Sequence, residues 1–466
     1  MNSLSSWSRK LLALVEKIGD GEHRKLRLSS LVKSAATSVG NRAVTMAVSF
    51  ISVPIAIRYL GREEYGAWVT IGSLLAWLQL TDFGFGNGLT NAITTAAAQD
   101  RQDLARMHVS NGFAVLSAIA GCVGLIGLLA WPIVDWSALL NVHSARARSD
   151  ISFAVLAAFL IFIAQFPLAL AGKVYLAFQE GKLGNYWGAA TSISSLLALL
   201  LVINLGGGLV GFVVAIAGTP MLVSLASNVW VFTRHRPHLS PSFRHMKLAE
   251  MAPLSRASGK FFLVAILALV TFQTDNLIIT HYLGAAQVPQ YSLTYTLFGY
   301  ASLPQSILFS YLWVAYNEAI ARKDIPWVKH AFYLNMTLSL AFAGIAVTVL
   351  FFIARPFIGW WAGPSVVPSY SLIGWIAAWT MINAYTNPMA CLLASAEHLR
   401  VQLIYSAIAT AANLALSIYL VHFWGVDGVI GATVISYGVF VCVPVLLDVI
   451  ALLAKLSRTS QAVGVT

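Results

Sequence analysis

The sequence predicts an all-α polytopic membrane protein with twelve transmembrane helices, arranged as two pseudo-symmetric six-helix lobes. Hydrophobic residues make up 58% of the 466 residues and charged residues only 10%, whereas soluble domains carry about 25% charged residues. Twelve apolar segments are each close to the ~20 residues that a helix needs to cross a bilayer. Two short motifs also recur at nearly the same offset, which indicates a duplicated half.

The duplication is indicated by two pairs of short motifs. Tyr59-Leu60-Gly61 recurs as Tyr282-Leu283-Gly284, an offset of 223 residues. Gly208-Leu209-Val210-Gly211 recurs as Gly428-Val429-Ile430-Gly431, an offset of 220 residues. We therefore expect residues 36–232 and 259–454 to form an N-terminal and a C-terminal lobe with the same helix path.

The first 35 residues precede the first apolar span and form a predicted cytoplasmic amphipathic segment. Within residues 4–18, apolar side chains recur at helical spacing while basic and acidic residues fall on the opposite face. Such a helix lies in the plane of the membrane and is attracted to anionic lipid. A disordered basic tail is the alternative interpretation.

The twelve predicted spans follow in order, and their bounds are 36–58, 66–90, 108–132, 150–172, 184–205, 208–232, 259–283, 288–314, 329–353, 366–393, 401–423 and 428–453. A short polar turn joins the first two spans. Very tight turns join the fifth span to the sixth and the eleventh to the twelfth, so each of these pairs should form a hairpin. Residues 233–258 are a predicted basic cytoplasmic linker between the lobes, and residues 455–466 form a cytoplasmic tail.

The basic residues predict the orientation in the membrane. Of the 29 Lys and Arg residues, 23 lie at the termini and in the even-numbered loops, 5 lie in the odd-numbered loops, and Arg42 lies within the first span. Because cytoplasmic loops are enriched in Lys and Arg, both termini are predicted to be cytoplasmic. The net charge of +11 is explained by this topology and by lipid contact, so no nucleic-acid partner is expected. The external loops are too short to fold into a catalytic domain, which argues against an enzyme.

Polar residues inside the spans are the main functional candidates, because hydrocarbon makes them costly. Asn41 and Arg42 lie in the first span, where Arg42 either lines a cavity and contacts an anionic headgroup or extends to the cytoplasmic interface. Asp82 in the second span and Asp275 in the seventh are candidates for coupling to a proton or cation. The alternative is that each acid anchors one helix to a neighbour, for Asp275 through Gln273, Asn276 or a tyrosine of the eighth span.

Further candidates lie in the seventh, eighth and tenth spans. Gln305, Asn383 and Tyr385 carry amide and phenol groups that suit a surface lined for sugars, although ordinary hydrogen bonds between helices use the same groups. Lys260 is a basic residue at the inner end of the seventh span. The three cysteines, Cys122, Cys391 and Cys442, fall in apolar stretches without metal-binding spacing. We therefore expect no metal site and no cofactor.

Four stretches, YLGREEYGAW, LTDFGFGNGL, TDNLIITHYLG and GVDGVIGA, resemble the Wzx-type polysaccharide flippases of the multidrug/oligosaccharidyl-lipid/polysaccharide superfamily. The resemblance extends over residues ~35–454. It implies a V-shaped bundle with two lobes around a central cavity. It also implies translocation of an undecaprenyl-diphosphate-linked oligosaccharide across the bacterial inner membrane, with membrane lipids and a polysaccharide polymerase or export machinery as candidate partners. Cavities in this family are often cationic, which points to Arg42 and Lys260.

Two other function classes compete with this interpretation. A drug/cation antiporter of the same superfamily should carry more acids inside the membrane, arranged for coupling. A membrane-embedded glycan polymerase or ligase should carry a large external loop with catalytic Arg or His, and this chain has none.

Overall fold

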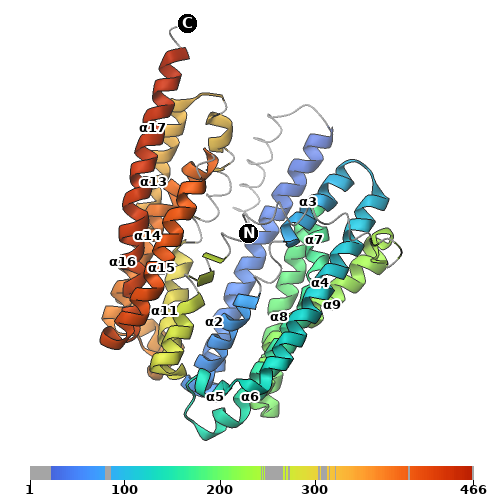
Figure 1. Cartoon of the computed structure of the whole chain (residues 1–466), viewed down its shortest axis with the longest axis vertical. Coiled ribbons are helices and arrows are strands. Elements are labelled where there is room, and N and C mark those ends of the chain that lie inside the picture. Colours follow the sequence, from blue (N-terminus) through green and yellow to red (C-terminus); the bar gives the residue numbers. More distant parts are fainter. Residues whose placement is uncertain are drawn as a thin grey trace, which may run out of the picture. The chain divides into compact units, whose positions relative to one another are not determined.

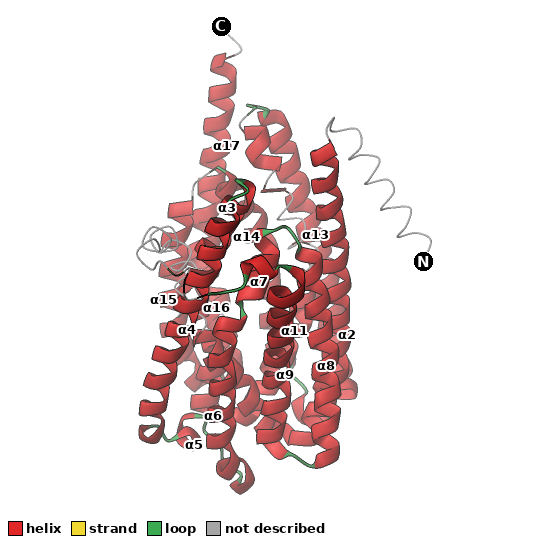
Figure 2. Ribbon diagram, turned by 90° about the vertical axis from the view of Figure 1, so that its right-hand side faces the viewer, coloured by secondary structure: helices red, strands yellow, loops and turns green. Residues whose placement is uncertain are grey.

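The computed structural model describes residues 22–78, 85–242, 244, 246, 266–267, 269–270, 273–302, 305, 312–313, 315–320, 322–396 and 399–463. Within these ranges the chain is helical and contains no β-strand (Figure 2). The predicted amphipathic helix at residues 4–18 and two candidate residues, Asp82 and Lys260, lie outside the described residues.

Long helices account for most of the described chain (Figure 1). Their bounds are α2 Glu22–Leu78, α3 Phe85–Ala98, α4 Gln102–Ala130, α6 Ala145–Leu168, α7 Leu170–Ala177, α8 Gly181–Leu205, α9 Gly208–Trp230, α11 Val288–Gly299, α13 Ile325–Trp361, α14 Tyr370–Ser395, α15 Leu399–Trp424, α16 Val426–Tyr437 and α17 Val443–Val463. Eight helical stretches of the described part are long and apolar enough to cross a membrane. The chain is therefore a polytopic membrane protein, and the total of twelve spans stays a prediction.

The predicted break between the first two spans is present in the structure as a kink in α2. Only Gly61 leaves the helical conformation there, with φ 78° and ψ 176°, so the break is narrower than the predicted polar turn. Because glycine has no Cβ, it adopts a positive φ without steric cost and the helix resumes at once. The sequence pattern could not show that a single residue is enough to redirect the helix.

Both predicted hairpins are present in the structure. Only Gly206 and Gly207 separate α8 from α9, and Gly206 ends α8 in the left-handed conformation, with φ 68° and ψ 32°. Gly425 alone separates α15 from α16 and also has a positive φ, 58°. A glycine beyond the last turn thus ends the first helix of each hairpin, which is a common way for helices to stop.

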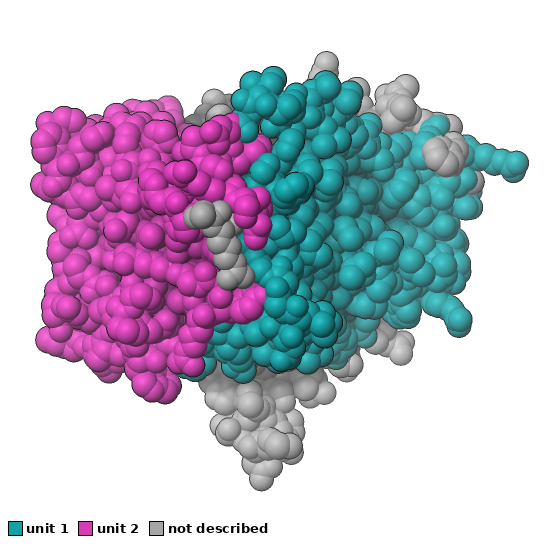
Figure 3. Space-filling view, turned by 90° about the horizontal axis from the view of Figure 1, so that it is seen from below, with its two compact units in different colours: residues 1–55, 79–134, 152–262 teal, residues 56–78, 135–151, 263–466 magenta. Residues whose placement is uncertain are grey.

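The chain divides into two compact units (Figure 3). Unit 1 comprises residues 1–55, 79–134 and 152–262, and unit 2 comprises residues 56–78, 135–151 and 263–466. The outer half of α2 and the segment 135–151 therefore belong to the unit that contains the C-terminal helices. The lobe limits expected from the sequence stay a prediction.

Each unit has its own apolar core. In unit 1, Leu89 and Ile93 of α3 pack with Val109 of α4 and with Leu170 and Val174 of α7, all fully buried. In unit 2 one cluster joins α11, α14 and α16, and a second joins α13, α14 and α17. Large apolar side chains are exposed on the outer faces of the helices, for example Leu129 on α4 and Phe352 on α13. Such exposure suits helices that face lipid.

The two copies of the Tyr-Leu-Gly motif share a backbone conformation. Gly284 has φ 91° and ψ 152°, close to the values at Gly61. The residues that follow the two copies also meet within unit 2, because Arg62 Nε donates to the Ala286 carbonyl and Arg62 Nη2 donates to Gln287 Oε1 at 2.8 Å. This shared geometry supports the predicted repeat at its first landmark, while superposition of whole lobes stays a prediction.

Candidate functional site

A buried carboxyl group lies at the centre of a polar chain in unit 2. Asp275, in the helical segment 273–283, is 3% exposed, and its Oδ2 accepts a hydrogen bond of 2.5 Å from Tyr291 Oη of α11. The Tyr291 ring stacks on Tyr295 with centroids 5.8 Å apart. Trp379 Nε1 of α14 donates to Tyr295 Oη at 3.3 Å. A carboxyl, two phenols and an indole thus join three helical segments.

The helix-anchoring interpretation of Asp275 predicted a partner among Gln273, Asn276 and a tyrosine of the eighth span, and Tyr291 is that tyrosine. The second carboxylate oxygen, Asp275 Oδ1, is buried without a hydrogen-bond partner among the described residues. A buried carboxylate charge is costly unless it is paired. One oxygen of this carboxyl is therefore held by a phenol, and the other has no hydrogen-bond partner among the described residues.

Polar contacts next to Asp275 tie the same helical segment to α2. Asn276 Nδ2 donates to Ser73 Oγ at 3.0 Å, and the hydroxyls of Thr70 and Thr280 lie 2.6 Å apart. Thr70 is fully buried and Ser73 nearly so. These contacts fix the orientation of the segment that carries the carboxyl.

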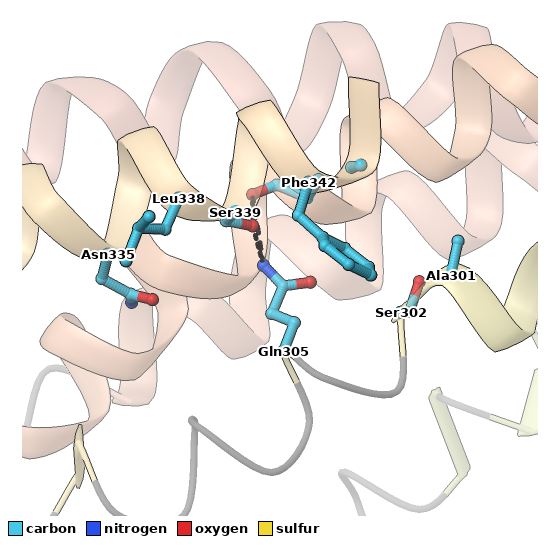
Figure 4. Close-up of a pocket in the computed structure, with 9 residues that line it drawn as sticks. Ala301, Ser302, Gln305, Asn335, Leu338, Ser339 and Phe342 are labelled. Atoms are coloured by element: carbon cyan, nitrogen blue, oxygen red, sulfur yellow. Dashed lines mark hydrogen bonds between the residues drawn. The ribbon is translucent and has the colours of Figure 1, made fainter. Parts of the chain in front are cut away.

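A second polar site surrounds Gln305. Its side-chain amide donates to Ser339 Oγ of α13 and to the Ala384 carbonyl of α14, and its Oε1 accepts from Asn387 at 3.3 Å. The cavity beside it has a volume of about 190 Å³. Figure 4 shows Gln305 reaching Ser339, with the apolar side chains of the lining around the pair. The cavity is mainly apolar, with the amide groups of Gln305 and Asn335 in its lining. It is smaller than the roughly 300–1,000 Å³ of ordinary small-molecule sites.

The two candidates of the tenth span, Asn383 and Tyr385, do not line this cavity. Asn383 Nδ2 donates to the Trp379 carbonyl of its own helix at 3.1 Å. Tyr385 packs against the apolar cluster formed by α13, α14 and α17. The sequence favoured Gln305, Asn383 and Tyr385 equally, but in the structure they contact different neighbours.

The predicted pair in the first span lies in unit 1, where α2 packs against α8. Thr37 Oγ1 accepts from Asn185 at 3.0 Å, and the Thr45 hydroxyl lies 2.9 Å from that of Ser192. A Cβ on Gly188 would lie 2.7 Å from Asn41 Nδ2, so Asn41 also packs at this seam. Arg42, one position further along the helix, is exposed.

An ion-pair cluster joins the ends of α7 and α9 in unit 1. Glu180 accepts from Arg236 at 2.8 Å and from His235 at 3.0 Å. Arg236 lies over the Phe178 ring at 3.7 Å. Burial alone would raise the pKa of Glu180, but the hydrogen bonds from Arg236 and His235 outweigh it and the pKa is lowered. The cluster therefore stabilises the fold near neutral pH, and this contribution is lost as the pH falls through the lowered pKa.

The chain is similar to proteins that are already known. The family described as polysaccharide biosynthesis protein matches residues 31–317. A putative O-antigen export protein of Yersinia pseudotuberculosis is 26% identical over 308 residues, covering 64% of this chain and 67% of that protein. A putative O-antigen transporter of Salmonella typhi is 22% identical over 437 residues, covering 90% and 96%.

A solved structure has the same fold. It is the inward-facing conformation of a multidrug resistance MATE family transporter of the MOP superfamily, with a TM-score of 0.76 and 13% sequence identity. The match covers 91% of this chain and 99% of that one. At this identity the likeness shows the fold alone.

Proposed function

Because this chain belongs to the polysaccharide biosynthesis protein family, we propose that it is a flippase for a lipid-linked glycan. It moves an undecaprenyl-diphosphate-linked oligosaccharide from the cytoplasmic to the periplasmic leaflet of the bacterial inner membrane, for the synthesis of surface or exported polysaccharide. The observation that carries this proposal is the family match over residues 31–317, together with the relatives named as O-antigen transporter and export protein.

The proposed mechanism is alternating access of a cavity between two lobes. Such a cavity needs polar groups for the sugar, a cation for the diphosphate and a group that couples opening to an ion gradient. Gln305 and Arg42 are the described candidates for the first two roles, and Asp275 is the candidate for the third. Delivery of the glycan to a polymerase or to export machinery completes the proposal.

A drug/cation antiporter is the second candidate function, because a solved structure with the same fold is a multidrug resistance MATE family transporter. The two functions are distinguished in a bacterium whose own O-antigen flippase is deleted. Restored surface glycan supports the flippase, whereas increased drug resistance without surface glycan supports the antiporter.

In that strain, Arg42→Ala is expected to lose glycan export while the protein stays in the membrane. The planar guanidinium binds phosphate oxygens through a fork of donors, so Arg42→Lys should retain part of the export through charge alone. Surface glycan is measured together with the amount of protein in the membrane. Arg58→Ala, an exposed arginine further along the same helix, is the control and should export normally. Full export by Arg42→Ala would show that Arg42 is not part of the binding site.

The orientation is tested with reporter fusions. We expect a fusion after residue 245 to report the cytoplasm and a fusion after residue 140 to report the periplasm, because 23 of the 29 basic residues lie on the predicted cytoplasmic side. Activity of an alkaline phosphatase and of a fluorescent-protein reporter at each position reads out the compartment. The topology is wrong if both positions report the same compartment.

A further inference from the structure

Two adjoining cavities lie beside α7 and α8 in unit 1. The larger has a volume of about 460 Å³ and is lined by residues of α7 and of the first turns of α8. The smaller, about 240 Å³, shares Ala169, Gly172, Tyr175 and Gly184 with the larger and extends to residues of α9. The shared lining makes the two cavities parts of one recess in this unit.

The larger cavity contains a cation in its lining. Lys173 of α7 is half-buried there, and no carboxylate among the described residues pairs with it. Glu180, the acid closest to it in the sequence, has its two oxygens engaged by Arg236 and His235. A partly buried ammonium without a counter-charge favours an anionic ligand.

Part of the lining of this cavity has no side chains. The cavity is lined by Gly172, Gly181 and Gly184. A Cβ on Gly172 would meet nothing within 4 Å, and one on Gly184 would meet only Tyr175 Cδ2, at 4.0 Å. Gly181 and Gly184 lie in the first turns of α8. The space beside these glycines leaves room in the cavity for a bulky anion next to the ammonium.

The same cavity has an apolar edge. Leu176, three residues after Lys173 on α7, lines the cavity and is 62% exposed. In a helix, residues three apart share one face, so the ammonium and the exposed leucine lie next to each other. This combination fits an amphiphile, with its phosphate at Lys173 and its hydrocarbon chain along Leu176. By the predicted topology this end of the helices faces the cytoplasm, the side from which the glycan lipid starts.

We propose that this recess binds the phosphate group of a membrane lipid, with Lys173 as its cation. The inference deepens the proposed function and rests on it for the lipid diphosphate of the substrate as a ligand. An anionic phospholipid offers the same phosphate chemistry, so the test must separate the two sources.

The test uses the purified full-length protein and two probes, undecaprenyl diphosphate and phosphatidylglycerol, with binding measured by native mass spectrometry. Lys173→Gln is expected to weaken binding about tenfold, the size of one charge-assisted contact, and Lys173→Arg should restore most of it. Lys182→Gln removes an exposed cation at the start of α8 that is not part of the cavity lining, so it is the matched control and should bind as the wild type does.

Gly184→Leu tests the cavity itself, because it keeps Lys173 but adds a large side chain to the cavity that both residues line. It should weaken binding as much as Lys173→Gln does, whereas Gly184→Ala should be tolerated. A larger loss for undecaprenyl diphosphate than for phosphatidylglycerol supports the substrate as the ligand, and equal losses support a phosphate site open to both lipids.

Three results would overturn the proposal: unchanged binding by Lys173→Gln, an equal loss in Lys182→Gln, or full affinity in Gly184→Leu. The binding assay does not depend on export. Failure of the flippase assay in cells would therefore reject the proposed function without affecting the binding result.

Discussion

Asp275→Asn is expected to abolish most glycan export while leaving the amount of folded protein in the membrane close to that of the wild type. Asparagine keeps the size of the side chain and an oxygen that accepts the Tyr291 hydrogen bond, but it cannot ionise. If the carboxyl loads and unloads a proton during alternating access, removing ionisation stops the cycle without removing the contact. Export should be measured over a range of external pH, beside the membrane level of each variant.

Two companion variants separate coupling from anchoring. Asp275→Glu keeps the ionisable group and should be milder than Asp275→Asn. Tyr291→Phe removes the hydrogen bond and keeps the carboxyl, so a purely structural role predicts that it lowers protein stability as much as any change at Asp275. Normal export by Asp275→Asn across the pH range would show that Asp275 only anchors its helix. The hypothesis that Asp275 couples transport to a proton would then be rejected.

The fold was predictable because the membrane constrains it strongly. The long apolar segments and the low proportion of charged residues predict an all-α polytopic protein. The resemblance to Wzx-type flippases is confirmed by the family match. The tight hairpins at Gly206 and Gly425 were predictable for the same reason, since no residues remain there for a longer loop. The break between the first two spans was also predictable from its polar stretch, but the sequence could not show that Gly61 alone makes the bend.

The sequence could predict which types of residue form the candidate sites, but not which of these residues lie together. A buried acid in an apolar span stands out in the sequence, and a tyrosine partner for Asp275 could be expected, but which tyrosine depends on how α11 packs. Lys173 was missed because it lies at the end of a span, where lysines usually help to set the orientation of the protein in the membrane. Its distinctive feature is the set of glycines around it, and these come from two different helices. Only the packing of α7 against α8 brings them together.

Gly66→Ala is expected to destabilise the protein although alanine is normally the better helix former. A Cβ at Gly66 would overlap the carbonyl oxygen of Ala285 and approach Pro289 Cδ to 3.2 Å. Exchanging glycine for alanine inside a helix gains about 1 kcal/mol, whereas overpacking costs about 1–3 kcal/mol and sometimes more. The cost should be at the upper end, because the obstacle is backbone and cannot rotate away as a side chain would.

Gly72→Ala is the matched control for this prediction, because it lies on the same helix and its Cβ would meet nothing within 4 Å. It should unfold at the wild-type temperature or slightly above it, while Gly66→Ala unfolds earlier, as measured by thermal unfolding of the purified protein in detergent. The contacts of Arg62 with Ala286 and Gln287 lie one helical turn away, so separating α2 from residues 285–289 would also loosen them. Equal unfolding temperatures for the two variants would show that the 285–289 segment can shift to admit the methyl group, and that this contact between the repeated motifs is not tightly packed.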